Sequence, residues 1–384
     1  MDLQSYWNRR RFLSHAAATA TLGVHRPLLS LQQRSHPPQS AASSPEEIAG
    51  KTRGLMTGQT ARPLRYHPQD GGFAIRNGRE FFNRPLYGPN NAFRVDAGDL
   101  PEFSLYLPGH GGNLRLGFST ETTAKWLIEA SDVVATYRMG RMSYEVRDPL
   151  LKQGSILLEL STMGQGEGLQ TRIQSREIPQ GTRLIWMFGG VSGRKGKRGG
   201  DIGCESEPVS QFFQVRPEEC KENHYFIESH KAVLSSKAAK LVLTFPSGSD
   251  LSVGDGKHWN DGWQAVNRFG KALTEEPVLL GSVDLNPGKS QYIEIKRTDG
   301  TTSPSAQEDV AESFTRRSKQ LETLASQIAL STPDPYIDAA AGALCLAGDA
   351  IWDDRQKCVM HGAVAWRNPL AGWRGPYVLD CLRW

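Results

Sequence analysis

The chain has 384 residues, of which 38% are hydrophobic and 22% are charged, and its formal net charge is +4. A charge this small for the length argues against a nucleic-acid-binding surface and against a basic membrane-binding patch. The 39 glycines and 22 prolines favour turn-rich β structure, because turns need residues that tolerate or fix unusual backbone angles.

The N-terminal segment has the pattern of an export signal. Residues 8–14 read Asn-Arg-Arg-Arg-Phe-Leu-Ser, and a mildly apolar run follows from His15 to Val24. This order is typical of a twin-arginine signal, although an ordinary basic tail has a similar composition. The run is too short to span a bilayer. We expect residues 1–58 to be a signal and a disordered linker, and the mature protein to be periplasmic or extracellular without membrane contact.

Residues 59–301 are predicted to form a large antiparallel β-sandwich. Apolar and polar residues alternate in 114–118 and 292–296, which indicates strands with one buried face. Asn77-Gly78 between two apolar arms predicts a hairpin over 73–82. Further strand-like segments are 103–107, 113–118, 126–130, 131–139, 141–146, 155–161, 169–178, 182–191, 223–229, 240–244, 278–284 and 290–296. No glycine-rich nucleotide-binding motif occurs.

After Thr302 the apolar period changes from that of strands to that of helices. Residues 305–308, Ser-Ala-Gln-Glu, form a capping-box pattern before a long amphipathic segment, so we expect a linker helix within 302–332. Asp334 as N-cap with Pro335 at the first helical position predicts the start of a second helix. A third helix is expected to begin near Pro376.

Several stretches resemble an uncharacterised bacterial family, Domain of Unknown Function 4450. They are Phe-Asn-Arg-Pro-Leu-Tyr-Gly at 82–88, Arg-Val-Asp-Ala-Gly-Asp-Leu-Pro-Glu-Phe at 94–103, Leu-Pro-Gly-His-Gly-Gly-Asn-Leu at 107–114, Gly-Asp-Ile-Gly at 200–203, and the closing run from 361 to 380. The order of sandwich, linker helix and helices also resembles the six-hairpin glycosidases, in which a β-supersandwich leads into an (α/α)6 toroid.

This resemblance implies the N-terminal part of an exported glycoside hydrolase that acts on a polysaccharide or oligosaccharide. The region 333–384 would be the start of a toroid that is incomplete within this chain. Whether the catalytic carboxylates lie beyond residue 384 stays open, and we expect this chain alone to be inactive or nearly so. Sugar, linkage, stereochemical outcome and oligomeric state stay open.

Three carboxylates near the end of the chain are candidate catalytic groups, because most glycosidases work with a pair of carboxyl groups. They are Asp353, Asp354 and Asp380. The structural alternative is that Asp353 and Asp354 are solvated loop charges and that Asp380 is an ion-pair partner of a nearby arginine.

A tryptophan- and arginine-rich loop follows and is a candidate sugar subsite. Indole rings can cover the flat apolar face of a sugar, and Arg or Asn can hold its hydroxyls or a uronate carboxylate. The candidate substrate-binding residues in this loop are His361, Trp366, Arg367, Asn368, Trp373 and Arg374. The alternative is that the indoles pack the joint between the sandwich and the helices.

A second polar cluster in the sandwich contains Asn83, Arg84 and Tyr87, and a glycine-rich turn carries His110. We expect these side chains to add substrate contacts from the sandwich, although His110 fits a plain tight loop equally well. Two other functions stay open. One is a non-catalytic carbohydrate-binding module, and the other is a polysaccharide lyase that uses His361, His110 or Tyr377 as its base. No metal site and no cofactor are expected.

Overall fold

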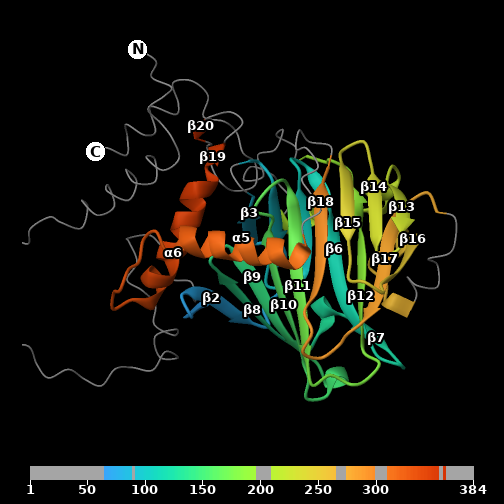
Figure 1. The fold of residues 1–384 in the computed structure, drawn as a ribbon, viewed down its shortest axis with the longest axis horizontal. Coiled ribbons are helices and arrows are strands. Elements are labelled where there is room, and N and C mark those ends of the chain that lie inside the picture. The colour runs from blue at the N-terminus through green and yellow to red at the C-terminus, as the bar shows by residue number, and fades with distance from the viewer. Residues whose placement is uncertain are drawn as a thin grey trace, which may run out of the picture.

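The computed structural model describes residues 65–88, 91–195, 209–264, 274–298, 309–353 and 358–359. Two antiparallel sheets lie face to face, and two helices follow them along the chain (Figure 1). The predicted fold class, a mainly β protein built on a large antiparallel sandwich and followed by helices, is therefore confirmed. The third helix expected near Pro376 lies outside the described residues.

The sandwich consists of a ten-stranded sheet and an eight-stranded sheet. In spatial order the first contains β1 (His67–Gln69), β2 (Gly72–Arg76), β8 (Asp132–Arg138), β9 (Arg141–Arg147), β10 (Ser155–Thr162), β11 (Gly168–Arg176), β18 (Gln291–Arg297), β15 (Lys240–Thr244), β14 (Lys231–Ser235) and β13 (His224–Glu228). The second contains β16 (Asp250–Asp255), β17 (Pro277–Asp284), β12 (Arg183–Val191), β6 (His110–Ser119), β5 (Glu102–Tyr106), β4 (Arg94–Ala97) and β3 (Arg84–Tyr87), and β7 (Ala124–Trp126) pairs with β6.

Short helical turns join several strands. They are η2 (Leu127–Glu129), η3 (Pro149–Leu151), α3 (Val209–Phe212), η5 (Pro217–Cys220) and η6 (Gly256–His258). The prediction of a strand over 126–130 is wrong, because β7 ends at Trp126 and the short helix η2 follows directly. Among the described strands of the two large sheets, β1, β3, β4, β7, β14 and β16 were not predicted.

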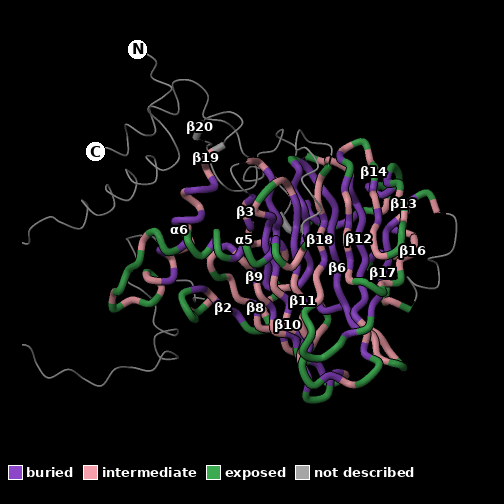
Figure 2. Tube along the Cα trace, viewed as in Figure 1, coloured by how far each residue is buried: buried purple, intermediate pink, exposed green. Residues whose placement is uncertain are grey.

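The core lies between the sheets and follows the alternation of the strands. Leu114, Leu116 and Phe118 of β6 are fully buried and belong to the same apolar cluster as Leu158 and Leu160 of β10. Buried residues concentrate along the central strands, and exposed residues lie in the peripheral loops (Figure 2). An alternating pattern thus produces two facing apolar surfaces that only stacking of the sheets can remove from water.

The hairpin turn predicted at Asn77-Gly78 is wrong, because the turn lies earlier in the chain, at Asp70-Gly71. β1 and β2 pair across Asp70 and Gly71, whose φ values of 48° and 73° are the left-handed angles that a two-residue hairpin turn requires. Asn77 instead ends β2. Its backbone N–H donates to the Val133 carbonyl at 2.8 Å, and its side chain accepts from the Val133 N–H at 2.9 Å. The strand that follows β2 in the sheet is therefore β8.

Two helices follow the sandwich. The first, α5 (Val310–Ala325), is capped by Asp309, whose side chain accepts from the Ala311 N–H at 3.1 Å. The helix start expected from the capping box at 305–308 is therefore wrong, because the chain begins its helical turns one residue after Asp309. α5 lies on the outer face of the ten-stranded sheet, where it contacts β10, β11 and β18 (Figure 1).

The second helix, α6 (Pro335–Ala350), begins as predicted, with Asp334 as its N-cap and Pro335 at its first position. It packs beside β1, β2 and β3 at the edge of the sandwich. A short pair of strands follows, β19 (Trp352–Asp353) and β20 (Cys358–Val359). α6 is thus the element that places helical residues against the edges of both sheets.

The packing of Trp186 tests this description of the core. Its indole is fully buried and stacks on Phe245 with ring centroids 4.8 Å apart. We expect Trp186→Ala to lower the free energy of unfolding by about 3–5 kcal/mol in a denaturant titration. The matched control is Phe226→Ala on β13, whose ring is 66% exposed and should contribute less than about 0.5 kcal/mol. Equal effects of the two substitutions would contradict the core assignment.

Candidate functional site

A pocket of about 790 Å³ opens where α6 meets the edges of both sheets. We call it the junction pocket. Its walls come from the residues before β1, from β2, β3 and β8, and from one face of α6. The described lining residues are Arg65, Tyr66, Phe73, Asn83, Arg84, Pro85, Tyr87, Tyr137, Tyr336, Ala340, Ala343, Leu344 and Ala347.

The helical wall has room for a ligand because its side chains are small. Tyr336, Ala340, Ala343 and Ala347 follow one another at spacings of four, three and four, so they lie on one face of α6. The adjacent Leu344 is 68% exposed, so its apolar side chain faces solvent at the pocket rim. The alanines leave space between the helix and the strands, and Tyr336 adds a ring to the helical wall.

Three of the substrate-binding residues proposed from the sequence meet in this pocket. Asn83, Arg84 and Tyr87 all line it. Arg94, which follows these residues along the chain, lies elsewhere. It is buried, its guanidinium is 4.0 Å from the centroid of the Tyr106 ring, and its Nε donates to Asp96 at 3.0 Å.

Behind the pocket wall lies one buried carboxylate, that of Asp99, whose side chain is 1% exposed. The Tyr66 hydroxyl donates to its Oδ1 at 2.5 Å and Asn83 Nδ2 donates to the same oxygen at 3.0 Å. The Glu80 N–H donates to Oδ2 at 3.1 Å, and Arg65 Nη2 lies 3.4 Å from the same atom. A buried carboxylate is stable when donors of this kind surround it.

Two glycines allow the Asp99 carboxylate to approach the loop that precedes β3. A Cβ added at Gly78 would lie 2.4 Å from Asp99 Oδ2, and one added at Gly98 would lie 2.4 Å from the Glu80 carbonyl. Neither distance is possible for a real side chain, so both positions need glycine. The Gly of the Asn77-Gly78 pair therefore serves this contact and not a hairpin turn.

Arg84 lies across the ring of Tyr66. Its guanidinium carbon is 4.3 Å from the ring centroid, which is cation–π geometry. Nη1 donates to the Asn83 carbonyl at 3.0 Å. Tyr66 is itself held by Asp99 and by Asn83 Nδ2, which donates to the Tyr66 oxygen at 2.7 Å. The arginine is thus positioned by a chain of contacts that begins at the buried carboxylate.

Two of the tyrosines that line the pocket, Tyr66 and Tyr137, are neutral phenols. Burial raises the pKa of Tyr66, and its hydrogen bond to Asp99 raises it further. Burial also raises the pKa of Tyr137 to about 12. Both hydroxyls therefore keep their protons at neutral pH and add no negative charge to the pocket wall.

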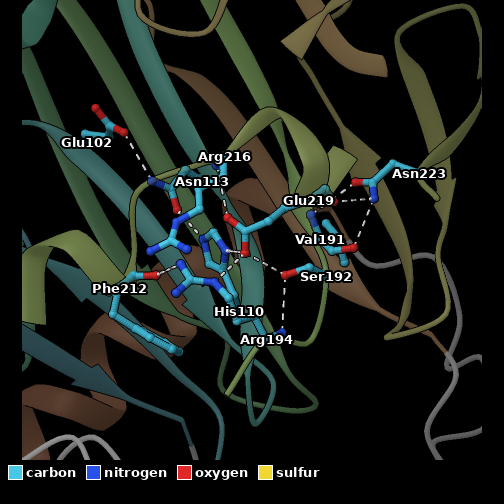
Figure 3. A network of polar contacts seen from close by, with 10 residues as sticks. All are labelled: Glu102, His110, Asn113, Val191, Ser192, Arg194, Phe212, Arg216, Glu219 and Asn223. Atoms are coloured by element: carbon cyan, nitrogen blue, oxygen red, sulfur yellow. Dashed lines mark hydrogen bonds and ion pairs between the residues drawn. The ribbon is translucent and has the colours of Figure 1, made fainter. Parts of the chain in front are cut away.

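His110, the fourth sandwich residue proposed as a substrate contact, is the first residue of β6 and is fully buried. It lies in a polar network that joins β5 and β6 to the 212–223 segment (Figure 3). Its Nδ1 is 3.0 Å from Glu219 Oε1, and its Nε2 is 3.0 Å from Asn113 Oδ1. Asn113 Nδ2 in turn donates to Glu102 at 3.1 Å. With both ring nitrogens occupied, His110 holds the sheet and the covering segment together.

Glu219 collects the donors of this network. Ser192 Oγ and Arg194 Nε each donate to its Oε1 at 2.8 Å, and the Arg216 N–H donates to Oε2 at 3.0 Å. Burial alone would raise the pKa of Glu219. The hydrogen bonds and charges of His110 and Arg194 outweigh burial and lower the pKa to about 2.

The remaining sequence candidates lie at the end of the chain. Asp353 is in β19, where its backbone pairs with Cys358 of β20. The other candidates are outside the described residues: Asp354, Asp380, His361, Trp366, Arg367, Asn368, Trp373 and Arg374.

Sequence reasoning missed Tyr66, Asp99, Tyr137 and Tyr336 as members of the site. They come from four different parts of the chain, and no local pattern joins them. The available signal was glycine at 78 and 98 beside Asp99, which indicates a close approach of the backbone. Within the described ranges no group of three or more His, Cys, Asp or Glu side chains could hold a metal ion. In that same part of the chain no helix is long and apolar enough to cross a bilayer.

The fold and the pocket define a two-sheet β-sandwich protein with an aromatic, arginine-bearing site at the joint between sandwich and helices. The family described as "Domain of unknown function (DUF4450)" matches residues 107–317, which is more than half of the chain. The chain belongs to this family. No curated protein matches the sequence.

Solved structures with a similar arrangement include two longer carbohydrate-active enzymes. A bacterial glucoamylase complexed with acarbose has 8% sequence identity and a TM-score of 0.48, over 71% of this chain and 42% of that one. A family GH92 inverting mannosidase from Bacteroides thetaiotaomicron has 9% identity and a TM-score of 0.33, over 72% of this chain and 37% of that one. The chain thus spans less than half the length of each.

Removing the carboxylate of Asp99 should disrupt the pocket wall formed by Arg65, Tyr66 and Asn83. Asp99→Ala leaves Tyr66, Asn83 and Arg65 without their shared acceptor, so we expect the free energy of unfolding to fall by about 3 kcal/mol or more in a denaturant titration. The control is Asp250→Ala, because Asp250 pairs with Arg183 at the surface with a side chain that is 73% exposed. That loss should stay below about 1 kcal/mol. A loss of similar size in both variants would contradict the role given to Asp99.

The lowered pKa of Glu219 predicts how stability depends on acid. The ionised carboxylate stabilises the fold fully above its ordinary pKa of 4.5, and that contribution disappears as the pH falls through about 2. We expect the unfolding free energy of the wild type to fall between pH 4.5 and pH 2. Glu219→Gln should be less stable near neutral pH and should lose less over that window than Glu121→Gln, a change at an exposed position. Identical slopes in the two variants would contradict this account.

Proposed function

We propose that this chain is the sandwich-bearing part of an exported glycoside hydrolase and that its junction pocket binds a glycan. The observation that carries the proposal is the lining of the pocket. Tyrosine and phenylalanine rings surround an open space, and Asn83, Arg84 and Arg65 lie among them. Rings that cover the apolar faces of a sugar, beside donors that hold its hydroxyls, are the two kinds of contact that a saccharide needs.

The described lining residues of the pocket include no Asp and no Glu. Glycosidases usually need two carboxyl groups at the scissile bond. We therefore assign binding, not hydrolysis, to this pocket. In the proposed whole enzyme, the sandwich occupies residues 59–301, the linker helix lies within 302–332, and the helical domain begins at 333. Export through the twin-arginine pattern at residues 8–14 belongs to the same proposal.

A non-catalytic carbohydrate-binding module is the second candidate function. The same observation supports it, because a binding pocket without acidic lining residues serves a module equally well. Hydrolysis by the protein extended beyond residue 384 separates the two functions. A hydrolase releases reducing ends from the glycan that the pocket binds, and a binding module releases none.

Substitution at Tyr336 tests whether the pocket binds glycan. Its ring lies on α6, with its centroid 6.5 Å from that of Phe73. After a glycan array has given a ligand for the wild-type chain, calorimetry should show about tenfold weaker binding for Tyr336→Ala. Tyr336→Phe keeps the ring and should stay within about threefold of the wild type.

Phe226→Ala on β13 is the control, because it removes an exposed ring at the opposite end of the sandwich (Figure 1). Its affinity should equal that of the wild type. Unchanged affinity in Tyr336→Ala, or no glycan bound by the wild-type chain, would count against the pocket as a glycan site.

A further inference from the structure

The two arginines that line the junction pocket, Arg65 and Arg84, differ in whether an acidic side chain pairs with them. Arg65 has acidic partners, because its Nη1 lies 2.8 Å from Glu80 and its Nη2 lies 3.4 Å from Asp99. Arg84 has none among the described residues, where its hydrogen bond goes to the uncharged carbonyl of Asn83. Among the described residues no acidic side chain pairs with this guanidinium, which has further N–H donors to offer.

The position of Arg84 is fixed without use of those donors. Its guanidinium carbon lies over the ring of Tyr66, 4.3 Å from the ring centroid, and Tyr66 is held by the buried Asp99 carboxylate. An arginine held against a ring loses less conformational freedom when it binds a ligand than one that moves freely in solvent. The fork of N–H groups matches two oxygens that lie in one plane.

No negative charge on the described pocket wall competes for this guanidinium. The described lining contains no acidic side chain, and Tyr66 and Tyr137 stay protonated at neutral pH, as argued above. The acidic partners of Arg65 lie behind the wall or outside it. An anion that entered the pocket would meet Arg84, neutral phenols and the Asn83 amide.

We propose that the junction pocket selects acidic glycans, with Arg84 binding the anionic group of a sugar residue while the tyrosine rings cover its apolar face. The inference rests on the proposed glycan-binding function and adds the class of ligand. Two groups share the required chemistry, the carboxylate of a uronic acid and the sulfate ester of a sulfated sugar. The planar pair of carboxylate oxygens matches the guanidinium fork best, so uronic acids are the favoured ligands.

The test compares one oligosaccharide in two charge states. A uronic-acid oligosaccharide and the same oligosaccharide after chemical reduction of its carboxyl groups are titrated into the 384-residue chain by calorimetry. A sulfated oligosaccharide forms a third arm. We expect the acidic form to bind at least about tenfold more tightly than the reduced form, with a difference that shrinks as salt is added. Tighter binding of the sulfated ligand than of the uronic one would assign the site to sulfate esters instead.

Variants of Arg84 link the preference to the residue. Arg84→Met should lose about tenfold in affinity for the acidic form and leave the reduced form within about twofold of wild type. Arg84→Lys keeps a charge without the fork and should give an intermediate loss. Arg147→Met is the control, because Arg147 is 57% exposed and pairs with Glu145 on β9, outside the pocket lining.

The outcomes separate the two proposals. Equal binding of the acidic and reduced forms, unaffected by Arg84→Met, would overturn the acidic preference and leave glycan binding intact. No binding of any form by the wild type would overturn both proposals. If Arg84→Met does not fold, the comparison of ligands on the wild type and Arg84→Lys still decides the question.

Discussion

The junction pocket depends on how one buried carboxylate is satisfied. A carboxylate as deeply buried as that of Asp99 is unfavourable unless donors surround it, and here the donors come from residues 65, 66, 80 and 83. Each of these residues belongs to the segments that lead into β1 and β3. Because Asp99 binds both segments, the loop before β3 and the chain before β1 lie together at the edge of the sandwich. The aromatic and basic side chains of the pocket follow from that arrangement.

The helices complete the site from the other side. Asp334 caps α6, and contacts with β1, β2 and β3 hold the helix at the sheet edges. Arg317 of α5 donates to the Tyr87 carbonyl at 3.1 Å, so the preceding helix is also joined to β3. Both α5 and α6 therefore contact the edge strand β3. A tyrosine on the helix and tyrosines on the strands face the same space for this reason.

The sequence predicted the sandwich because alternation is a local property. Leu114, Leu116 and Phe118 show it within five residues, and strands built this way were found close to their predicted bounds. Strand pairing is not local. Asn77-Gly78 has the composition of a hairpin turn, yet the turn forms at Asp70-Gly71, and Gly78 instead allows the close approach of Asp99. β3 was missed because Pro85 weakens its strand signal, although an edge strand tolerates proline.

The candidate site, like the fold, was predictable from the sequence only where its residues are neighbours along the chain. Asn83, Arg84 and Tyr87 are neighbours in the sequence, so their clustering could be read directly. Tyr66, Tyr137 and Tyr336 reach the pocket through the fold alone, since they lie before β1, on β8 and on α6, which no local pattern brings together. His110 was selected for its glycine-rich surroundings, and these glycines instead let the chain turn into β6 beside a buried network.

The most direct test of the account is a crystal structure of the chain with a uronic-acid oligosaccharide bound. We predict that one sugar residue lies in the junction pocket, with its carboxylate oxygens within hydrogen-bonding distance of Arg84 and its ring against the pocket tyrosines. Asp99 should keep its hydrogen bonds to Tyr66 and Asn83 in that complex. An oligosaccharide bound elsewhere on the molecule, with the junction pocket unchanged, would contradict the account.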